Sequence, residues 1–487
     1  MLFSSITFLV FFFPVTLVLY YALPSLRFRN CLLLFASLLF YAWGEPKFVL
    51  VMIASILFNY GAGLLLTSCK KKLLVLIAAI VVNLGCLFVF KYLGFSIKII
   101  DLFLKALHFK AIEQINLVLP LGISFYTFQS ISYLVDVYKN PEFAQRNAMK
   151  LGLYIAFFPQ LIAGPIVRYH DINTQIDQRT HSVEKVAQGL ERFIIGLSKK
   201  VLLANAFALV CDKIYAAQMT EYGAYAAWIA CFAYALQIYY DFSGYSDMAI
   251  GLAKIFGFSL TENFNYPYAA SSVTDFWKRW HISLTNFFRD YVYIPLGGNR
   301  KGKIRTILNR YIVFFITGLW HGAAFNFILW GLAHGTLMTI ERLFLKKSPN
   351  SEQSEGSAAT SQEKLKKCLK LIFSHAYTIL AVALLWVLFR NGTGNSVRLL
   401  LKMVGLKTQN VVLNEYLHLY IDTRFFILSA LGIIFSFPWW HKIPFPKTGA
   451  KAGIILSLKY LVLAALLVLC YANLADSSYN PFIYFRF

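Results

Sequence analysis

Long apolar runs alternate with short polar loops along most of the chain. The runs at residues 73–92 and 454–475 are representative, because each is long enough to cross the hydrocarbon core of a bilayer as one helix. The same pattern predicts helices at residues 5–23, 31–43, 47–66, 73–92, 118–137, 151–165, 192–212, 225–256, 310–328, 328–345, 371–390, 424–438 and 454–475.

These segments predict an all-α polytopic membrane protein with about 11–13 membrane helices. The first run, 5–23, has no basic residue before it and no small-residue cleavage site after it. We therefore expect a first membrane span rather than a removed signal peptide. The run at 151–165 is short for a full crossing and is expected to be re-entrant.

Three stretches depart from the pattern of continuous apolar helices. Residues 120–139 carry hydroxyls, an amide and an acid, whereas residues 157–172 contain two prolines and a glycine and cannot form one regular helix. Residues 275–303 alternate aromatic and charged side chains, which predicts an interfacial or re-entrant helix followed by a glycine-rich basic loop. Broken backbone at membrane depth must be covered by protein or line a water-filled cavity, so we expect a central funnel or tunnel open to the cytoplasm.

A polar segment, SPNSEQSEGSAATSQEK, separates the last two groups of apolar runs. Its composition is typical of a flexible linker. We expect four parts: N-terminal membrane helices (1–115), a core (116–345), this linker (346–370) and C-terminal membrane helices with a polar-aromatic tail (371–487). No internal repeat is evident, which weakens a secondary-transporter hypothesis.

The composition agrees with a membrane protein, since 58% of residues are hydrophobic and only 14% are charged. The net charge of +23 comes from basic residues in the loops, which the positive-inside rule explains better than a nucleic-acid partner does. The basic loops at Arg27, Arg29 and Lys70–Lys72 predict an N-terminus outside the cytoplasm. The seven cysteines have no metal-ligand or redox spacing, so no metal is expected.

The segment GLWHGAAFNFILWGLAHG (318–335) holds two histidines in an apolar run. Ionisable residues inside membrane segments are functional candidates. On one helix His321 and His334 would lie about 220° apart and could not share a ligand. Small neighbours of His321 would let another backbone or a narrow substrate tunnel pass close to its ring, whereas His334 is expected to pack or form a hydrogen bond.

Two acids, Asp241 and Asp247, lie six residues apart in YYDFSGYSDMAIGLAKIFGF. This spacing does not place them on one helical face. We expect them, together with Asp136, to support a cavity through a buried polar network rather than to act directly in catalysis. Signatures of soluble hydrolases and nucleotide-binding proteins, such as GxSxG and the Walker loop, are absent from the sequence.

Several long segments resemble the membrane-bound O-acyltransferase family, and most closely its bacterial alginate O-acetyltransferase branch. They are LPLGISFYTFQSISYLVDVYK, FFPQLIAGPIVRY, YYDFSGYSDMAIGLAKIFGF, NFNYPYAASSVTDFWKRWHISLTNFFRDYVYIPLGGNR, GLWHGAAFNFILWGLAHG and YNPFIYFRF. The resemblance implies that His321, in its WHG context, is catalytic and that His281 is a second active-site candidate. Asp275, Trp320 and Asn326 join the two acids above as expected cavity-supporting residues.

The resemblance also implies a cytosolic acyl donor, acetyl-CoA. Its phosphates would meet Lys278, Arg279, Arg300, Lys301 and Lys303, although positive-inside charge explains each of these residues equally well. An imidazole with a pKa near neutrality suits the acceptance of a proton from a hydroxyl and its return to a leaving thiolate, and His321 is the expected base.

The tail NPFIYFRF admits two interpretations. It is either an amphipathic anchor at the membrane interface or, by resemblance to the small partner of the D-alanyl-teichoic acid system, an acyl carrier through Tyr484. A phenolic ester keeps a high transfer potential because phenolate is a good leaving group. The carrier role requires the tail to lie outside the cytoplasm.

The leading hypothesis is an O-acetyltransferase of the bacterial inner membrane that serves an extracytoplasmic polysaccharide. An alginate-like exopolysaccharide is the first candidate acceptor and peptidoglycan the second. The resemblance implies a periplasmic partner of the SGNH-hydrolase type. The alternatives are D-alanyl transfer to teichoic acid and a non-enzymatic transporter or polysaccharide-export channel.

Overall fold

The computed structural model describes residues 1–115, 117–217, 222–344, 361–406, 419–439, 448–476 and 479–483. Within these ranges the regular elements are helices, and no strand occurs. This confirms the all-α expectation. His418, His441 and Tyr484, together with most of the predicted linker, lie outside the described residues.

Six of the described helical segments are long and apolar enough to cross a membrane. Many of their large apolar side chains are exposed to the surroundings of the protein, as for Leu50, Val82 and Val468. Such exposure of large apolar side chains is expected where the solvent is lipid. The chain is therefore a multi-pass membrane protein, with spans at Leu26–Gly44, Val49–Ser68, Lys72–Ala106, Val183–Ala216, Leu365–Arg390 and Ala450–Asp476.

The chain forms two compact units. Unit 1 comprises Met1–Leu202, Asp241–Glu262 and Leu456–Phe487, and unit 2 comprises Leu203–Tyr240 and Asn263–Ile455. The helix α12 (Ala224–Ile255) contributes its first half to unit 2 and its second half to unit 1.

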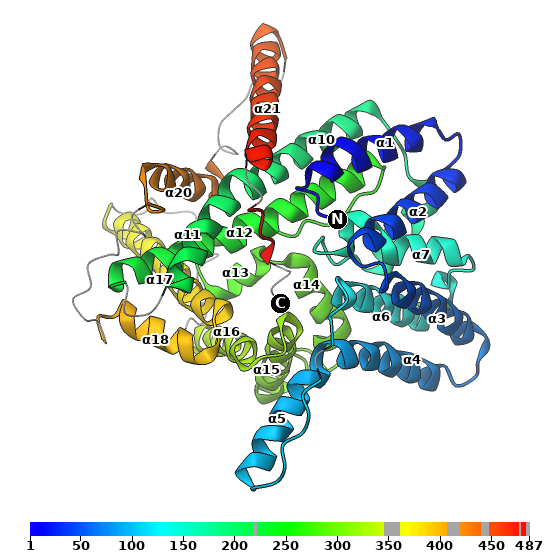
Figure 1. Ribbon diagram of the computed structural model, residues 1–487, viewed down its shortest axis with the longest axis horizontal. Coiled ribbons are helices and arrows are strands. Elements are labelled where there is room, and N and C mark those ends of the chain that lie inside the picture. The colour runs from blue at the N-terminus through cyan, green and yellow to red at the C-terminus, as the bar shows by residue number, and fades with distance from the viewer. Residues whose placement is uncertain are drawn as a thin grey trace. The chain divides into compact units, whose positions relative to one another are not determined.

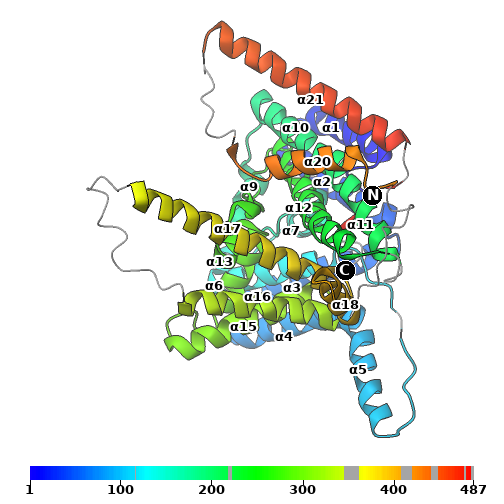
Figure 2. The ribbon, with the colours of Figure 1, turned by 90° about the vertical axis from the view of Figure 1, so that its left-hand side faces the viewer.

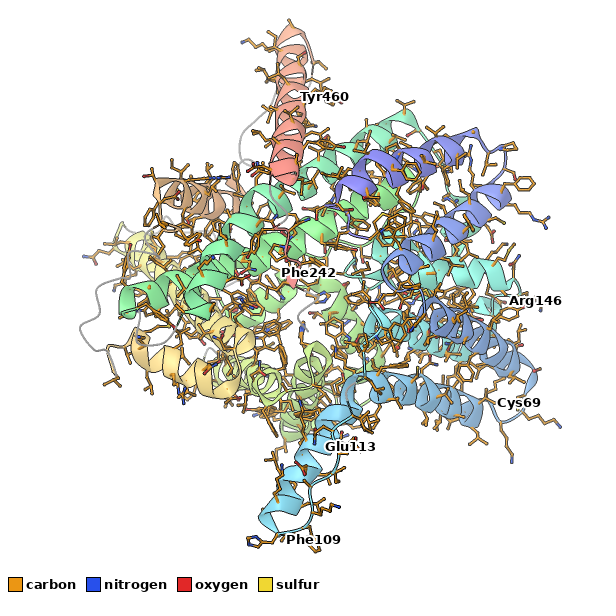
Figure 3. All side chains as sticks on the ribbon, viewed as in Figure 1. Cys69, Phe109, Glu113, Arg146, Phe242 and Tyr460 are labelled. Carbon is orange, nitrogen blue, oxygen red and sulfur yellow. The ribbon has the colours of Figure 1, made fainter. Side chains whose placement is uncertain are left out.

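Unit 1 is built from helices of the N-terminal half and the C-terminal helix (Figure 1). The turn at Cys69 joins α3 to α4, and Phe109 follows the end of α5 (Figure 3). In chain order its elements are the π-helical turn Thr7–Phe12, α1 (Phe13–Ala22), α2 (Leu26–Gly44), α3 (Val49–Ser68), α4 (Lys72–Leu87), the π-helical turn Phe88–Tyr92, α5 (Leu93–Ala106), α6 (Ile123–Lys139), the 3-10 turn Pro141–Phe143, α7 (Ala148–Ala156), α8 (Phe158–Leu161), α9 (Tyr169–Gln178), α10 (Val183–Ser198), the end of α12 and α21 (Ala450–Asp476).

The prolines in residues 157–172 break the chain as the sequence predicts. The helix α8 has only four residues, and the chain then runs without regular structure until α9. The broken backbone is buried, and the amide of Phe158 donates to the Ser37 hydroxyl at 3.0 Å. Polar side chains from neighbouring helices thus satisfy the backbone that the prolines expose.

The helices α10 and α12 approach each other closely at two pairs of glycines. A β-carbon at Gly189 would lie 2.7 Å from the carbonyl oxygen of Gly251, and one at Gly196 would lie 2.6 Å from that of Gly244. The two glycines of each helix are seven residues apart and therefore lie on nearly the same face. This stripe of small residues sets the contact between the helices.

Unit 2 is built around the pair α15 and α16, which lie side by side (Figure 2). A π-helical turn at Lys199–Ala204 leads into it from unit 1. The elements of unit 2 are α11 (Asn205–Ala216), the start of α12, the 3-10 turn Pro267–Ala269, α13 (Val273–Arg279), α14 (Ile282–Phe288), the π-helical turn Arg289–Tyr293, α15 (Gly302–His321), α16 (Phe325–Phe344), α17 (Ser361–Arg390), α18 (Thr393–Met403) and α20 (Thr423–Phe435).

The stretch 275–303 forms two short helices and a π-helical turn rather than the single interfacial helix that the sequence predicts. The break falls at His281, whose backbone is left-handed with φ 45°. A left-handed residue cannot continue a right-handed helix, so α13 ends before it and α14 begins after it.

Helices α3 and α4 are joined by a buried pair of amides. The Asn59 Nδ2 group donates to Asn83 Oδ1 at 3.0 Å, and the Asn83 Nδ2 group donates to Asn59 Oδ1 at 2.9 Å. We expect Asn59→Leu to lower the free energy of unfolding by about 1–2 kcal/mol, because it removes both hydrogen bonds between the helices and leaves the buried Asn83 Oδ1 atom without the donor that Asn59 supplies. Unfolding by denaturing detergent measures this loss.

The double variant Asn59→Leu/Asn83→Leu is expected to recover part of that loss, since no buried amide is then left unpaired. Asn395→Leu, at an exposed position on α18, is the control and should change the free energy of unfolding by less than about 0.5 kcal/mol. Strict additivity of the two single effects would contradict the pairing.

Candidate active site

The two histidines of residues 318–335 belong to different helices. His321 is the last residue of α15, and α16 begins at Phe325 after a break that opens with Gly322 in extended backbone. The expectation that His321 and His334 lie on opposite faces of one helix is therefore wrong, because the chain reverses between them. The predicted boundary at residue 328 falls inside α16 for the same reason.

Small residues let the backbones of α15 and α16 pass close to each other. A β-carbon at Gly331 would overlap the carbonyl oxygen of Phe314 and would lie 3.2 Å from the α-carbon of Gly318. A β-carbon at Gly322 would overlap the Phe327 ring. Of the two uses that the sequence allowed for these small residues, the approach of a second backbone is the one that the structure shows.

His321 is buried among aromatic rings. Its ring centroid lies 4.8 Å from that of Trp320, 5.2 Å from that of Trp330 and 5.1 Å from that of Phe389. All three contacts are edge-to-face, the arrangement that aromatic rings favour. The imidazole therefore occupies a site with apolar walls, with only 6% of the residue exposed.

His281 is fully buried at the junction of α13 and α14. Its Nδ1 atom lies 3.0 Å from Asn263 Oδ1, and the Ser283 hydroxyl donates to the same oxygen at 2.8 Å. An amide oxygen only accepts, so the His281 Nδ1 atom carries the proton in this contact. In the neutral ring the Nε2 atom then keeps its lone pair, as a general base requires.

Trp320 links the two histidines. Its ring centroid lies 5.8 Å from that of His281 and 4.8 Å from that of His321. Trp320 is adjacent to His321 in sequence, so the end of α15 brings His321 to the junction that holds His281. The structure thus brings together three of the residues that the sequence singles out.

The remaining residues of this region hold the helices in place. The Trp277 indole donates to His334 Nδ1 at 3.2 Å, which confirms His334 as a hydrogen-bonding residue. The buried Glu341 carboxylate accepts the amides of Val273 and Thr274 at 2.6 Å and 3.0 Å, at the start of α13. A carboxylate suits this position because the first amides of a helix have no partner within the helix.

Two other predicted supporting residues make local contacts within unit 2. Asp275 pairs with Arg279 on α13, with Oδ2 3.0 Å from Nε. Asn326 donates through Nδ2 to the carbonyl oxygens of Leu388 and Phe389 at 3.4 Å and 3.3 Å. Asn326 thereby holds the end of α17, including the Phe389 ring that packs on His321.

Asp241 and Asp247 lie in unit 1, and each pairs with a different lysine. Asp241 Oδ1 lies 2.7 Å from Lys200 Nζ, and Asp247 Oδ2 lies 2.6 Å from Lys199 Nζ. Asp247 also accepts from Arg192 at 2.9 Å. The acids therefore form polar pairs on α12, of which the pair of Asp241 is buried and that of Asp247 is half-buried. Whether they support a cavity stays a prediction.

The candidate phosphate contacts are on accessible parts of unit 2. Lys278 is exposed on α13, while Arg300, Lys301 and Lys303 are exposed around the start of α15. Asn309 holds the preceding loop by donating to the Gly298 carbonyl at 2.9 Å. Their role toward a phosphorylated donor stays a prediction. Among the described residues no cluster of histidine, cysteine or carboxylate side chains could hold a metal ion.

Comparison with known proteins gives a consistent result. A model of the membrane-bound O-acyltransferase family matches residues 141–352. A probable alginate O-acetylase, AlgI, of Pseudomonas putida is 37% identical over 510 residues, which cover all of both chains. The chain belongs to the membrane-bound O-acyltransferase family. Its resemblance to that family, predicted from the motifs, is confirmed.

Two further relatives are named for other activities. The peptidoglycan O-acetyltransferase of Helicobacter pylori is 36% identical over 83% of this chain and 80% of its own length. The teichoic acid D-alanyltransferase of Bacillus subtilis is 31% identical over 47% of this chain and 61% of its own length. Membership of the O-acyltransferase family makes this chain an acyl-transferring enzyme, and both His281 and His321 fall within the matched residues.

Three residues that form buried contacts within the matched region are not predicted from the sequence. Asn263 lies 18 residues from His281, Glu341 closes a long apolar run, and Lys200 sits in a basic pair with Lys199. Only Glu341 could have been recognised from the sequence, because an acid within a membrane segment must be paired with another group. The partners of Asn263 and Lys200 depend on the tertiary structure.

The close approach of α15 and α16 makes a specific prediction. Gly331→Ala should lower the unfolding temperature of the purified protein and its acyl-transfer activity, because the new methyl group overlaps the Phe314 carbonyl. Gly335→Ala is the matched control four residues on, where a β-carbon meets its nearest neighbour at an ordinary 3.4 Å. There the better helix propensity of alanine should keep or raise the stability. Equal unfolding temperatures of the two variants would refute the close contact of α15 with α16 at Gly331.

Proposed function

We propose that this enzyme moves an acetyl group from cytosolic acetyl-CoA across the bacterial inner membrane for the O-acetylation of an extracytoplasmic polysaccharide. The observation that carries the proposal is the pair of buried histidines, His281 and His321, on either side of Trp320 in an O-acyltransferase. Acyl transfer to a hydroxyl needs a base at a site from which water is kept out.

The names of the relatives support a polysaccharide acceptor. Alginate is the acceptor in the name of the relative that spans the whole chain, and peptidoglycan in that of the Helicobacter pylori relative. An alginate-like exopolysaccharide is therefore our first candidate and peptidoglycan the second. D-alanyl transfer is a weaker candidate, because the Bacillus subtilis relative matches less than half of this chain.

His321 acts as the general base in the proposed reaction. It takes the proton from the attacking hydroxyl while the hydroxyl oxygen bonds to the thioester carbonyl carbon. The carbon–sulfur bond then breaks, and the same proton passes to the thiolate, which leaves as the free thiol of coenzyme A. His281, whose Nδ1–H bond to Asn263 leaves Nε2 as the basic atom, is the second proton-handling group.

The basic residues of unit 2 are proposed to receive the donor. Lys278, Arg279, Arg300 and Lys301 offer positive charge to the phosphates of coenzyme A. Only the acetyl group then has to cross the membrane, because the large polyanionic carrier stays in the cytosol. The basic loops place the N-terminus outside the cytoplasm in this proposal, and the carrier role proposed next requires the C-terminus to lie outside as well.

Tyr484 is the proposed acyl carrier. Its phenol would attack the thioester, and its ester would pass the acetyl group to a periplasmic transferase of the SGNH-hydrolase type. Phenolate is a good leaving group, so this route conserves most of the transfer potential of the thioester. The support comes from the resemblance of the tail NPFIYFRF to the D-alanyl system.

The role of His321 is tested by His321→Ala. We expect polysaccharide acetylation to fall by roughly 10²-fold to 10⁴-fold, the usual contribution of a general base. Asp177→Asn is the control, since Asp177 forms an exposed ion pair with Lys150 in unit 1. Solid-state NMR of envelope polysaccharides measures the acetyl signals, and membrane insertion of each variant is checked in parallel. Full acetylation by the inserted alanine variant would exclude His321 as the base.

The role of Tyr484 is tested by incubating purified enzyme with acetyl-CoA labelled in its acetyl group. Mass spectrometry should find one acetyl group on Tyr484 in the wild type and none in Tyr484→Phe, which lacks the attacking oxygen. Polysaccharide acetylation should be lost with it. A fully active phenylalanine variant would leave the tail as a membrane anchor.

A further inference from the structure

The last described residues of the chain are buried, although chain ends are usually loosely held. Phe482 and Ile483 are each only 3% exposed, and they belong to unit 1. They follow α21, most of whose side chains are exposed, including Tyr460 (Figure 3). The burial of the tail therefore requires specific contacts with the rest of unit 1.

The buried ion pair Asp241–Lys200 forms hydrogen bonds with the tail backbone at two points. The Ile483 amide donates to Asp241 Oδ2 at 2.7 Å, and the Lys200 ammonium donates to the carbonyl oxygen of Pro481. Asp241 Oδ1 and Lys200 Nζ are themselves 2.7 Å apart. The negative partner thus takes the backbone donor of the tail, and the positive partner takes its acceptor.

Two further contacts fix the register of the same segment. The Asn480 side chain donates to the Ser4 carbonyl oxygen at 2.9 Å. The Phe482 ring stacks on Tyr245 with 4.8 Å between centroids. Four consecutive residues of the tail, 480–483, are therefore each held by a different contact within unit 1.

The ion pair has little value as a device for stability alone. Its side chains are 3% and 2% exposed, and well-packed apolar residues of the same volume usually stabilise a fold as well as such a pair does. A buried pair is favourable when its remaining donors and acceptors form further hydrogen bonds. Here the tail backbone provides those hydrogen bonds. Because these contacts are made to the backbone, they fix where the tail lies and do not select which side chains it carries.

A π-helical turn makes this pairing possible. Lys199 and Lys200 are consecutive in the turn Lys199–Ala204, and they reach two acids six residues apart on α12. Such turns redirect side chains and are frequent at functional sites. The neighbouring pair Lys199–Asp247 makes none of the tail contacts described above. It can therefore serve as the control pair in experiments on Lys200–Asp241.

We propose that Asp241 and Lys200 are positioning residues that dock residues 480–483 and so fix the point from which Tyr484 continues. This inference rests on the proposed carrier role of Tyr484. A carrier must reach the acyl donor and then the acceptor from one defined anchor, and effective reaction rates depend steeply on such placement. The docking of the tail can be measured independently of the carrier role.

Hydrogen–deuterium exchange of the intact protein, read by mass spectrometry on the C-terminal peptide, tests the docking. In Asp241→Asn the amide of Ile483 loses a charged acceptor, so its exchange should speed up at least about tenfold. Lys200→Met/Asp241→Leu should give the same result without leaving a lone buried charge. The matched control Lys199→Met/Asp247→Leu should leave tail exchange as in the wild type.

Acetylation of Tyr484 from labelled acetyl-CoA tests the positioning. Ile483→Pro removes the amide proton that Asp241 accepts, while Ile483→Val keeps it and serves as the control on the tail itself. We expect the rate of acetyl-Tyr484 formation to fall roughly tenfold or more in Ile483→Pro and Asp241→Asn, with Ile483→Val close to wild type. An unchanged unfolding temperature in Ile483→Pro separates lost positioning from lost folding.

Three results would overturn the inference. Unchanged exchange in both Asp241 variants would show that the pair does not dock the tail. Faster exchange with undiminished acetylation of Tyr484 would show that docking has no part in the reaction. Absence of any acetyl group on wild-type Tyr484 would remove the carrier role and the positioning role with it, while the exchange measurement would still decide the docking.

Discussion

Every polar group that this chain carries into its apolar helices must find a partner within the protein, since lipid offers none. That constraint explains the polar contacts of both units. In unit 1 the Asn59–Asn83 amides pair between helices, and Asp241 pairs with Lys200. In unit 2 the Glu341 carboxylate takes the first amides of α13. Each of these side chains thereby ties together segments that are distant in sequence.

Close backbone approach accompanies some of these contacts. Gly189 and Gly196 face Gly251 and Gly244 across the contact of α10 with α12, directly before and beside the lysines and acids that pair there. Gly318 and Gly331 do the same for α15 and α16 and bring His321 into its ring of aromatic side chains. Small residues at these positions thus allow the close helix packing beside which the polar contacts form.

The sequence predicts those parts of the fold that depend on local composition. Hydropathy places residues 225–256 almost where α12 lies, and the two prolines after residue 157 correctly predict broken helices. It fails at residues 322–324, where an unbroken apolar run hides a reversal of the chain that only the packing of α16 on α15 determines. The partner of His281, Asn263, has no signal of its own because its role arises from a fold that closes over seventeen intervening residues.

The surroundings of the two histidines bear on how an acyl-transferring enzyme avoids hydrolysis. Water competes with any hydroxyl acceptor for a thioester, so the base that activates the acceptor must not activate water as well. Trp320, Trp330 and Phe389 pack edge-to-face against His321, and only 6% of that residue is exposed. His281, by contrast, lies beside Asn263 and Ser283, whose side chains fix its tautomer. Both imidazoles are buried, and the Trp320 ring, 5.8 Å from His281 and 4.8 Å from His321 between centroids, lies against both of them.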